Sequence, residues 1–317
     1  MKQFTSVKDV PFSVNELIAK AAAIKKSPYS SKIGQNKTLG LIFFNPSLRT
    51  RMSTQKAASN LGMNVITMNI GEEGWKLEME DGTRMDGGAQ EHIKDAVKVM
   101  SQYVDILGVR SFAKLKNREE DYSEIVLNQF IKHAEVPIIS LESAIRHPLQ
   151  SLADFLTISE QKVKKPKIVV TWAPHPRALP QAVVNSFLEW GRLTEADIVL
   201  TYPKGYELDP QFTEGIEVVN NQNEAMEGAD IVYTKNWSSY SKYGKILDIS
   251  DSWMITPKKM ELTHNGKFMH CLPVRRNIVV HDEVLDHSLV YEQAKNRVFS
   301  AQAVLKQLLE SSKNGKS

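Results

Sequence analysis

The segment Ser47-Leu48-Arg49-Thr50-Arg51 combines groups that bind a phosphate. It follows an apolar stretch and opens a stretch with helical character. A helix start offers unpaired backbone N–H groups and the positive end of the helix dipole, and Ser47 adds a hydroxyl. Arg49 and Arg51 would be unfavourable at the start of a purely structural helix, because cations are stabilised at the other end. A bound anion would offset that cost; a serine-capped helix with solvated arginines is the alternative.

Two further arginines, Arg110 and Arg297, support a compact and highly charged anion. Arg110 follows another apolar stretch, although a surface salt bridge would explain it equally well, and Arg297 lies early in the last helical stretch. Neither G-x-x-x-x-G-K-[ST] nor G-x-G-x-x-G occurs in the sequence, so the predicted ligand is smaller than a nucleotide.

His147 and Gln150 flank Pro148, a residue favoured at the first position of a helix. A histidine can donate a hydrogen bond to a carbonyl oxygen as negative charge builds on it, and a glutamine amide can bind a neutral amide. A histidine taken alone is more often structural, so this pair indicates a site only together with the arginines.

Cys271-Leu272-Pro273 follows the last apolar stretch before the terminal helix. The backbone carbonyls of such a turn can accept hydrogen bonds from an amine. A nucleophilic Cys271 would need a base and cationic surroundings, so we favour a binding role over a covalent one.

Apolar, β-branched stretches alternate with helical patterns along the whole chain. The predicted strands are 38–44, 64–69, 104–109, 137–141, 167–172, 197–202, 230–234 and 267–271. The main predicted helices are 48–61, 91–102, 122–133, 149–161 and 291–311. Nearly continuous apolar strands predict parallel sheets covered by helices on both faces, which is the doubly wound α/β pattern. Ligands bind beyond the carboxyl ends of such strands, where the residues above lie.

Length and composition narrow the class of protein. The 317 residues predict two domains, 1–145 and 146–297, with a terminal helix, 298–317, packing back on the first. A net charge of +3, from 40 basic and 37 acidic residues, argues against nucleic acid as a partner. One cysteine and no long apolar run predict a cytoplasmic protein without a membrane span. The 8 histidines show no ligand-like spacing, so we predict neither a metal nor a cofactor.

Four motifs together resemble the aspartate/ornithine carbamoyltransferase family. They are Ser47–Arg51, His147–Gln150, His270–Pro273 and Asn296-Arg297, and they occur in the family's order and spacing over nearly the whole chain. The resemblance implies an enzyme that transfers the carbamoyl group of carbamoyl phosphate to an amine, without a cofactor. It also implies a homotrimer with active sites shared between subunits.

Roles follow from the resemblance, residue by residue. The implied catalytic residues are Arg110, His147 and Cys271. The implied carbamoyl phosphate ligands are Ser47, Leu48, Arg49, Thr50, Trp75, Arg110, His147, Gln150, Cys271, Leu272 and Arg297. The implied contacts to the second substrate are Gln90, Glu142, His175, Lys235 and Arg275. Trp75 would reach the site of a neighbouring subunit; a tryptophan of the core or surface is the alternative.

The second half of the chain departs from plain ornithine carbamoyltransferases. Lys235 stands where those enzymes carry an acidic and hydroxyl pattern for the free α-amino group. A cation repels an ammonium group and attracts a carboxylate. Trp172–Arg177 also resembles the branch that acts on Nα-acylated ornithines, in which the chain is knotted; we expect the knotted loop at Pro174–Pro180.

Two glutamines favour a succinyl over an acetyl group on the substrate. Gln90 lies where acetylornithine enzymes have glutamate, which would repel a succinyl carboxylate, and Gln302 lies where they have lysine. The resemblance thus implies carbamoylation of N-succinylornithine in arginine biosynthesis, with N-acetylornithine and then ornithine as alternative substrates. A nicotinamide-dependent oxidoreductase is disfavoured because its glycine fingerprint is missing, and a non-catalytic homologue because the phosphate-side residues are all present.

Overall fold

A computed structural model describes residues 1–30, 32–249 and 252–314. The chain divides into two compact units. Unit 1 comprises Met1–Lys114, Glu119–Leu149 and Arg297–Ser317, and unit 2 comprises Leu115–Arg118 and Gln150–Asn296. The first unit therefore keeps His147 and Arg297, and the longer segment of the second begins at Gln150.

Unit 1 is built on a four-stranded parallel sheet in the order β2-β1-β5-β6. Its strands are β1 (Thr38–Phe43), β2 (Asn64–Asn69), β5 (Ile106–Arg110) and β6 (Ile138–Glu142). The central strands β1 and β5 are buried almost throughout, as their apolar sequences predict. Because the strands are parallel, the residues that follow each of them collect at one edge of the sheet.

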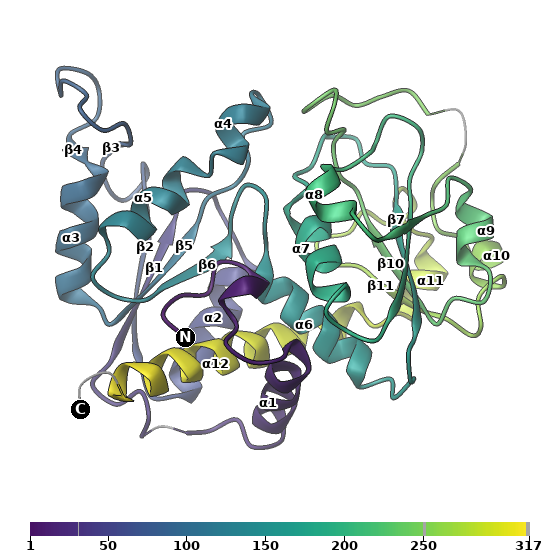
Figure 1. The fold of residues 1–317 in the computed structure, drawn as a ribbon, viewed down its shortest axis with the longest axis horizontal. Helices are drawn as coiled ribbons and strands as arrows, with labels where there is room; N and C mark the ends of the chain where they lie inside the picture. Colours follow the sequence, from purple (N-terminus) through teal and green to yellow (C-terminus); the bar gives the residue numbers. More distant parts are fainter. Residues whose placement is uncertain (31, 250–251, 315–317) are drawn as a thin grey trace. The chain divides into compact units, whose positions relative to one another are not determined.

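Helices cover both faces of this sheet (Figure 1). On one face, Ile93 and Val97 of α3 and Phe130 of α5 pack against Ile42 and Leu107. The other face carries α2 and α12 (Figure 1). The helical elements of unit 1 are η1 (Val7–Asp9), α1 (Val14–Lys26), α2 (Arg49–Asn60), α3 (Ile93–Tyr103), α4 (Arg118–Tyr122, from Glu119 onward), α5 (Ile125–His133) and the later part of α12 (Val290–Asn314).

From Arg297 onward, α12 belongs to unit 1. Asn60 Nδ2 donates a buried hydrogen bond to Gln302 Oε1 (3.0 Å), and Ser300 Oγ donates to the carbonyl of Leu149 (3.0 Å). Figure 1 shows α12 (yellow) next to α1 (purple), with the two helix axes at an angle to each other. Residues 315–317, the end of the predicted terminal helix, lie outside the described residues.

The prediction of one helix over 122–133 is wrong, because the chain breaks between α4 and α5. Glu124 lies in the left-handed region, with φ 47° and ψ 38°. Its carboxylate lies 3.7 Å from Arg146 Nη1 and accepts a hydrogen bond from Ile145 N (3.5 Å). These tertiary contacts are the physical reason for a backbone conformation that a continuous helix would not allow.

A short two-stranded parallel sheet, β3 (Leu77–Glu78) and β4 (Glu91–His92), was not predicted. It occupies the start of the predicted helix 91–102, which in the structure begins at Ile93. His92 caps that helix, since its Nδ1 accepts from Lys94 N (3.1 Å). The sheet closes the segment that ends at Gln90, and Trp75 lies two residues before its first strand.

Unit 2 is built on a five-stranded parallel sheet in the order β11-β10-β7-β8-β9. Its strands are β7 (Lys167–Trp172), β8 (Asp197–Thr201), β9 (Glu217–Val218), β10 (Ile231–Lys235) and β11 (Lys267–Met269). Its helices are α6 (Pro148–Ser159, from Gln150 onward), α7 (Ala182–Gly191), α8 (Pro210–Thr213), α9 (Gln222–Met226), α10 (Pro257–Met260), α11 (Asp282–Asp286) and the start of α12. Two parallel-sheet units confirm the predicted α/β fold class.

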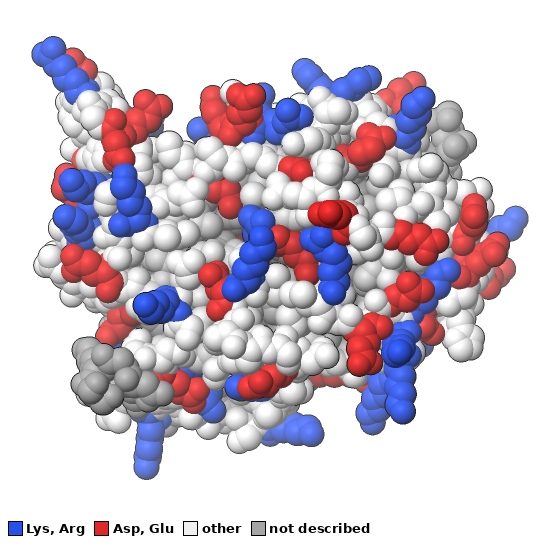
Figure 2. Space-filling model, viewed as in Figure 1, with Lys and Arg blue, Asp and Glu red and all other residues white. Residues whose placement is uncertain are grey.

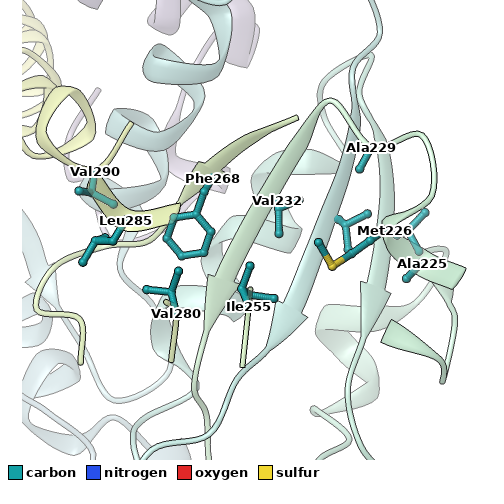
Figure 3. Packing of buried hydrophobic residues seen from close by; sticks show 11 residues of the cluster. Ala225, Met226, Ala229, Val232, Ile255, Phe268, Val280, Leu285 and Val290 are labelled. Atoms are coloured by element: carbon teal, nitrogen blue, oxygen red, sulfur yellow. The ribbon is translucent and has the colours of Figure 1, made fainter. Parts of the chain in front are cut away.

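Both faces of this second sheet are buried. On one face Val232 and Phe268 pack with Met226 of α9, Leu285 of α11 and Ile255 (Figure 3). On the other face the ring of Tyr233 stacks on Phe187 of α7 (centroids 4.1 Å apart), and Phe187 stacks on Phe155 of α6 (4.7 Å). Alternate residues of β10 thus enter opposite layers, as a central strand requires.

Strand β11 ends at Met269, two residues before the predicted end at Cys271. The physical reason is that His270 N donates to a side chain, Gln293 Oε1 (3.1 Å), and not to a neighbouring strand. Between β7 and α7 the segment 174–180 is irregular, and its Leu179 carbonyl accepts from Ser238 N (2.9 Å). The knot expected in this segment stays a prediction.

Charges of both signs are interspersed on the molecular face seen in Figure 2. Within residues 1–30, 32–249 and 252–314, no helix combines the length and apolar character that crossing a membrane demands. The same described residues include no cluster of three or more His, Cys, Asp or Glu side chains that could hold a metal ion.

Candidate active site

The start of α2 in unit 1 carries the predicted phosphate-binding segment. The chain leaves β1 at Phe43 and enters the helix at Arg49. Ser47 Oγ accepts from Thr50 N (3.3 Å), while the buried Arg297 donates from Nη2 to Thr50 Oγ1 (2.6 Å). Arg297 is far away in the sequence, and the fold of unit 1 brings it to this helix start. The arrangement joins helix N–H groups, two hydroxyls and a guanidinium.

The ends of β5 and β6 bring Arg110, Glu142 and His147 together. Arg110 is the last residue of β5, and its Nη2 donates to Glu142 Oε2 (3.2 Å) at the end of β6. His147 Nε2 lies 3.6 Å from the same carboxylate oxygen. Arg110 Nη1 also donates to the carbonyls of Asn45 (3.0 Å) and Pro46 (2.7 Å), just before α2. The guanidinium is thus held between the strand end and the phosphate segment.

Burial shapes the electrostatics of this cluster. Arg110, Glu142 and His147 are all buried. Burial lowers the pKa of the Arg110 guanidinium from its usual value, and the negative charge of Glu142 opposes that shift. The ion pair therefore keeps a cation at the sheet edge, where a developing oxyanion would be stabilised. Glu142, expected at the second substrate, groups here with Arg110 and His147.

Trp75 and Gln90 lie close to the small sheet of unit 1: Trp75 lies two residues before β3, and Gln90 directly precedes β4. Trp75 is 54% exposed, and its Nε1 donates to Glu91 Oε2 (2.8 Å). Gln90 is exposed, and its backbone N donates to the carbonyl of Lys76 (3.2 Å). An exposed tryptophan held by its indole N–H suits a contact with another molecule better than a core role.

In unit 2, Lys235 is the last residue of β10 and is buried. His175 follows β7, and its Nε2 accepts from Arg275 Nε (3.1 Å). Its Nδ1 lies 2.9 Å from the carbonyl oxygen of Arg177 and 3.1 Å from the backbone N of Arg177, so both ring nitrogens have polar partners. Burial lowers the pKa of His175, and the charges of Lys235, Arg275 and Arg177 lower it further. A neutral histidine among cations leaves a positive cluster that suits a carboxylate.

Gln150 and Cys271 lie at the start of α6 and after β11, both in unit 2. Both are buried, and Gln150 Nε2 donates to Asp154 Oδ1 (2.7 Å). Leu272 is partly buried against the core of unit 2. The predicted residues of unit 2 therefore form two groups. Lys235, His175 and Arg275 make up a cationic group, and the other group consists of the Gln150 amide and the backbone at Cys271-Leu272.

Two family models match nearly the whole chain. The carbamoyl-P binding domain of aspartate/ornithine carbamoyltransferase matches residues 2–160, and the Asp/Orn binding domain matches residues 180–308. The chain belongs to the aspartate/ornithine carbamoyltransferase family.

Relatives within this carbamoyltransferase family differ in their similarity to the chain. An N-succinylornithine carbamoyltransferase of Bacteroides fragilis (strain 638R) is 52% identical over 316 residues, covering 98% of this chain and 99% of the relative. An N-acetylornithine carbamoyltransferase of Xanthomonas axonopodis pv. citri (strain 306) is 34% identical, covering 96% of both chains.

Among solved carbamoyltransferase structures, a mutant of N-acetyl-L-ornithine transcarbamylase is similar with a TM-score of 0.90 and 32% identity. It covers 97% of this chain and 100% of that one. In that mutant a single glutamate is replaced by proline, and the protein is complexed with carbamyl phosphate and N-succinyl-L-norvaline.

Sequence reasoning about this carbamoyltransferase missed the residues that hold the predicted ones in place. Asp154 was not predicted, although its spacing of four from Gln150 on a helix puts both on one face. Tyr233 and Gln293 also bond to Asp154, at 2.8 and 2.7 Å, from distant parts of the chain. No local sequence signal links those two to α6.

Proposed function

We propose that this chain transfers the carbamoyl group of carbamoyl phosphate to the δ-amine of N-succinylornithine, giving N-succinylcitrulline and phosphate. The observation that carries the proposal is 52% identity, over nearly its full length, to a relative named for that activity. The buried Arg110–Glu142–His147 cluster beside the α2 start supplies the chemistry that carbamoyl phosphate requires.

The phosphate group is assigned to Ser47, Leu48, Arg49, Thr50 and Arg297. Backbone N–H groups at the start of α2 bind its oxygens, and the helix dipole favours its charge. Thr50 Oγ1 accepts from Arg297, so the hydroxyl can donate its own hydrogen to a phosphate oxygen (2.6 Å to Nη2). Arg49 adds a second positive charge, beside that of Arg297, to balance the negative charge of the phosphate.

The carbamoyl end is assigned to Arg110, His147 and Gln150. Attack on the carbamoyl carbon places negative charge on its oxygen, and hydrogen-bond donors fixed beforehand stabilise that charge without reorganising. Arg110 is fixed by Glu142 and by two backbone carbonyls. Gln150 binds the carbamoyl –NH2 group.

The acylornithine is assigned to the residues of unit 2. Lys235, His175 and Arg275 bind its carboxylate, and a free α-ammonium group would be repelled by the same cations. The backbone carbonyls of Cys271 and Leu272 orient the δ-amine. Acylation removes the α-ammonium charge, so this cluster favours an acylated over a free ornithine.

The succinyl group is assigned to the neighbourhood of Gln90. A neutral side chain leaves room for the second carboxylate, whereas a glutamate would repel it. This agrees with the solved N-acetyl-L-ornithine transcarbamylase mutants, in which a replaced glutamate accompanies bound N-succinyl-L-norvaline.

The chemical step balances without a cofactor. The neutral δ-amine attacks the carbamoyl carbon, a C–N bond forms, and the bond from that carbon to the phosphate oxygen breaks. We assign the amine proton to the departing phosphate, because no side chain of the assigned set is an evident base. A pH–rate profile of kcat controlled by a protein group titrating near neutrality would contradict that assignment.

We also propose a homotrimer in which Trp75 serves a neighbouring subunit's site. Among the large apolar side chains that unit 1 exposes are Leu48, Met52, Ile66 and Trp75. Exposed apolar side chains of this size favour burial against another chain. Mixing inactive Trp75→Ala and Arg49→Ala proteins should regenerate roughly a quarter of the active sites, if each site takes one residue from each of two subunits in a ring. Mixtures as inactive as the separate variants would contradict sharing.

A direct assay tests the proposed function. Phosphate release from carbamoyl phosphate is followed with N-succinylornithine, N-acetylornithine and ornithine as acceptors, and the carbamoylated product is identified by mass. We expect the highest kcat/KM with N-succinylornithine and the lowest with ornithine. Preference for free ornithine would refute the role of Lys235.

A further inference from the structure

A buried carboxylate in unit 2 lies at the centre of a hydrogen-bond network. Asp154 on α6 is 0% exposed. Its Oδ1 accepts from Gln150 Nε2 (2.7 Å) and from Gln293 Nε2 (2.7 Å), and its Oδ2 accepts from the hydroxyl of Tyr233 (2.8 Å). Three neutral donors from three separate elements thus converge on one acceptor. Such satisfaction is what a buried carboxylate needs.

The carboxylate fixes which way both amide groups point. An ionised carboxylate only accepts hydrogen bonds, so Gln150 and Gln293 must turn their –NH2 groups toward Asp154. Gln293 then presents its Oε1 to the opposite side, where it accepts from His270 N (3.1 Å). That bond holds the backbone at the point where β11 has ended. Asp154 therefore fixes both the orientation of Gln150 and, through Gln293, the backbone that leads into Cys271.

Tyr233 completes the network as a permanent donor. Burial raises the pKa of its hydroxyl well above the usual value, and the charge of Asp154 raises it further. Its ring stacks on Phe187 at 4.1 Å, so the hydroxyl has little freedom to leave the carboxylate. Asp154 is consequently anchored on both oxygens.

We propose that Asp154 is a positioning residue for carbamoyl transfer: through Gln150 it orients the amide that binds the carbamoyl group, and through Gln293 and His270 it sets the Cys271–Leu272 carbonyls that orient the amine. This inference rests on the proposed function, which assigns those roles to Gln150, Cys271 and Leu272. Asp154 itself touches neither substrate.

A carboxylate suits this role better than the amide of asparagine. Asparagine has one accepting and one donating end, so it would direct an –NH2 group at one of the three donors. Either the hydroxyl of Tyr233 or a glutamine amide would then have to turn away. A glutamine that turned would present its nitrogen where its oxygen is required.

A double-mutant cycle tests the first half of the proposal. Asp154→Asn should lower kcat by about 30-fold, within the range for coupled neighbours in one network. In a Gln150→Ala background the same change should lower kcat by less than about 5-fold, because the amide through which Asp154 acts on the carbamoyl group is absent. An equal loss in both backgrounds would mean that Asp154 acts independently of Gln150, and would overturn this half.

Gln293→Met tests the second half and remains usable if Asp154→Asn does not fold. We expect at least a tenfold loss in kcat/KM for N-succinylornithine, with the carbamoyl phosphate Kd from calorimetry unchanged within about twofold. Gln222→Met is the matched control: Gln222 is a buried amide of unit 2 whose Nε2 donates to Thr171 Oγ1 (2.7 Å) and the Trp253 carbonyl (3.2 Å). It should lower the Tm but leave kcat/KM unchanged. Equal kinetic losses in both variants would overturn the proposal.

The proposal and the function on which it rests fail in different ways. A wild-type protein that carbamoylates none of the three acceptors contradicts the proposed function. A wild-type protein that is active, with Asp154→Asn and Gln293→Met both retaining full kcat/KM, contradicts only the role of Asp154.

Discussion

Glu142→Gln separates the charge of the Arg110–Glu142 pair from its shape. Glutamine has nearly the same volume and keeps an oxygen that can accept from Arg110 Nη2. What is lost is the negative charge, 3.2 Å from the guanidinium, with side-chain exposures of only 7% and 9%. Arg110 would then be a buried cation whose desolvation, already opposing its charge, is no longer offset.

The magnitude follows from the distance. With an effective dielectric constant of about 20, two unit charges 3.2 Å apart attract by ~5 kcal/mol. Breaking one partner of a buried pair costs about 3–5 kcal/mol, and the retained hydrogen bond returns ~1 kcal/mol. We therefore expect the free energy of unfolding to fall by about 3 kcal/mol and the Tm by roughly 6–10 °C. Affinity for carbamoyl phosphate should fall about tenfold, because the guanidinium is no longer held at the sheet edge.

Thermal and urea unfolding, with calorimetric titration of carbamoyl phosphate, measure both effects. Glu124→Gln is the matched control in the same unit, since Glu124 pairs with Arg146 at the longer distance of 3.7 Å and away from Arg110. It should cost about 1 kcal/mol and leave carbamoyl phosphate affinity unchanged. A stability loss below 1 kcal/mol for Glu142→Gln, or equal affinity losses in both variants, would refute the reasoning.

Three further predictions concern specificity, pH and the phosphate site. Gln90→Glu should lower kcat/KM for N-succinylornithine about tenfold more than for N-acetylornithine, whereas Gln90→Met should change both values by the same factor. Steady-state kinetics with both acceptors measure this. An equal loss for the two acceptors in Gln90→Glu would contradict the prediction. Burial, followed by the positive charge of Lys235, holds the pKa of His270 well below its usual value. As the pH falls below ~6.5, the imidazole of His270 therefore gains a proton in the unfolded state but not in the folded state. The free energy of unfolding should fall by up to about 1.4 kcal/mol for each pH unit below ~6.5, and less steeply in His270→Gln. Urea unfolding at several pH values measures this. The same pH dependence of the free energy of unfolding in both proteins would disprove it. Thr50→Val should weaken carbamoyl phosphate binding about tenfold in calorimetry, while the Kd of the product N-succinylcitrulline should stay within about twofold. An unchanged carbamoyl phosphate Kd would remove Thr50 from the phosphate site.

Buried parallel strands were the most predictable part of this fold. The ranges 64–69 and 167–172 were predicted with their observed ends, because a glycine (Gly71) or a proline (Pro174) follows each of them two residues later. Strand β11 was predicted two residues too long, since the bond from His270 N to Gln293 depends on a helix more than twenty residues later. Local sequence carries no information about that partner.

For the candidate site too, features encoded in the local sequence could be predicted, and contacts between distant residues could not. The positions of Ser47–Arg51 at a helix start and of Arg110 at a strand end could be predicted, because helix starts and strand ends have local signatures. The pairing of Glu142 with Arg110 and His147 required the fold, since a carboxylate at a strand end fits a substrate contact equally well. The break at Glu124 was missed for a related reason: its left-handed conformation is stabilised by contacts to 145–146, and not by a glycine.

The central claim is that guanidinium groups and the start of α2 bind one small phosphoester. A crystal soaked with carbamoyl phosphate tests it most directly. The predicted result is density for the phosphate against Ser47, Thr50 and Arg297, with the carbamoyl oxygen within hydrogen-bond distance of Arg110 and His147. Density for the compound at any other place, with these side chains not contacting it, would contradict the claim.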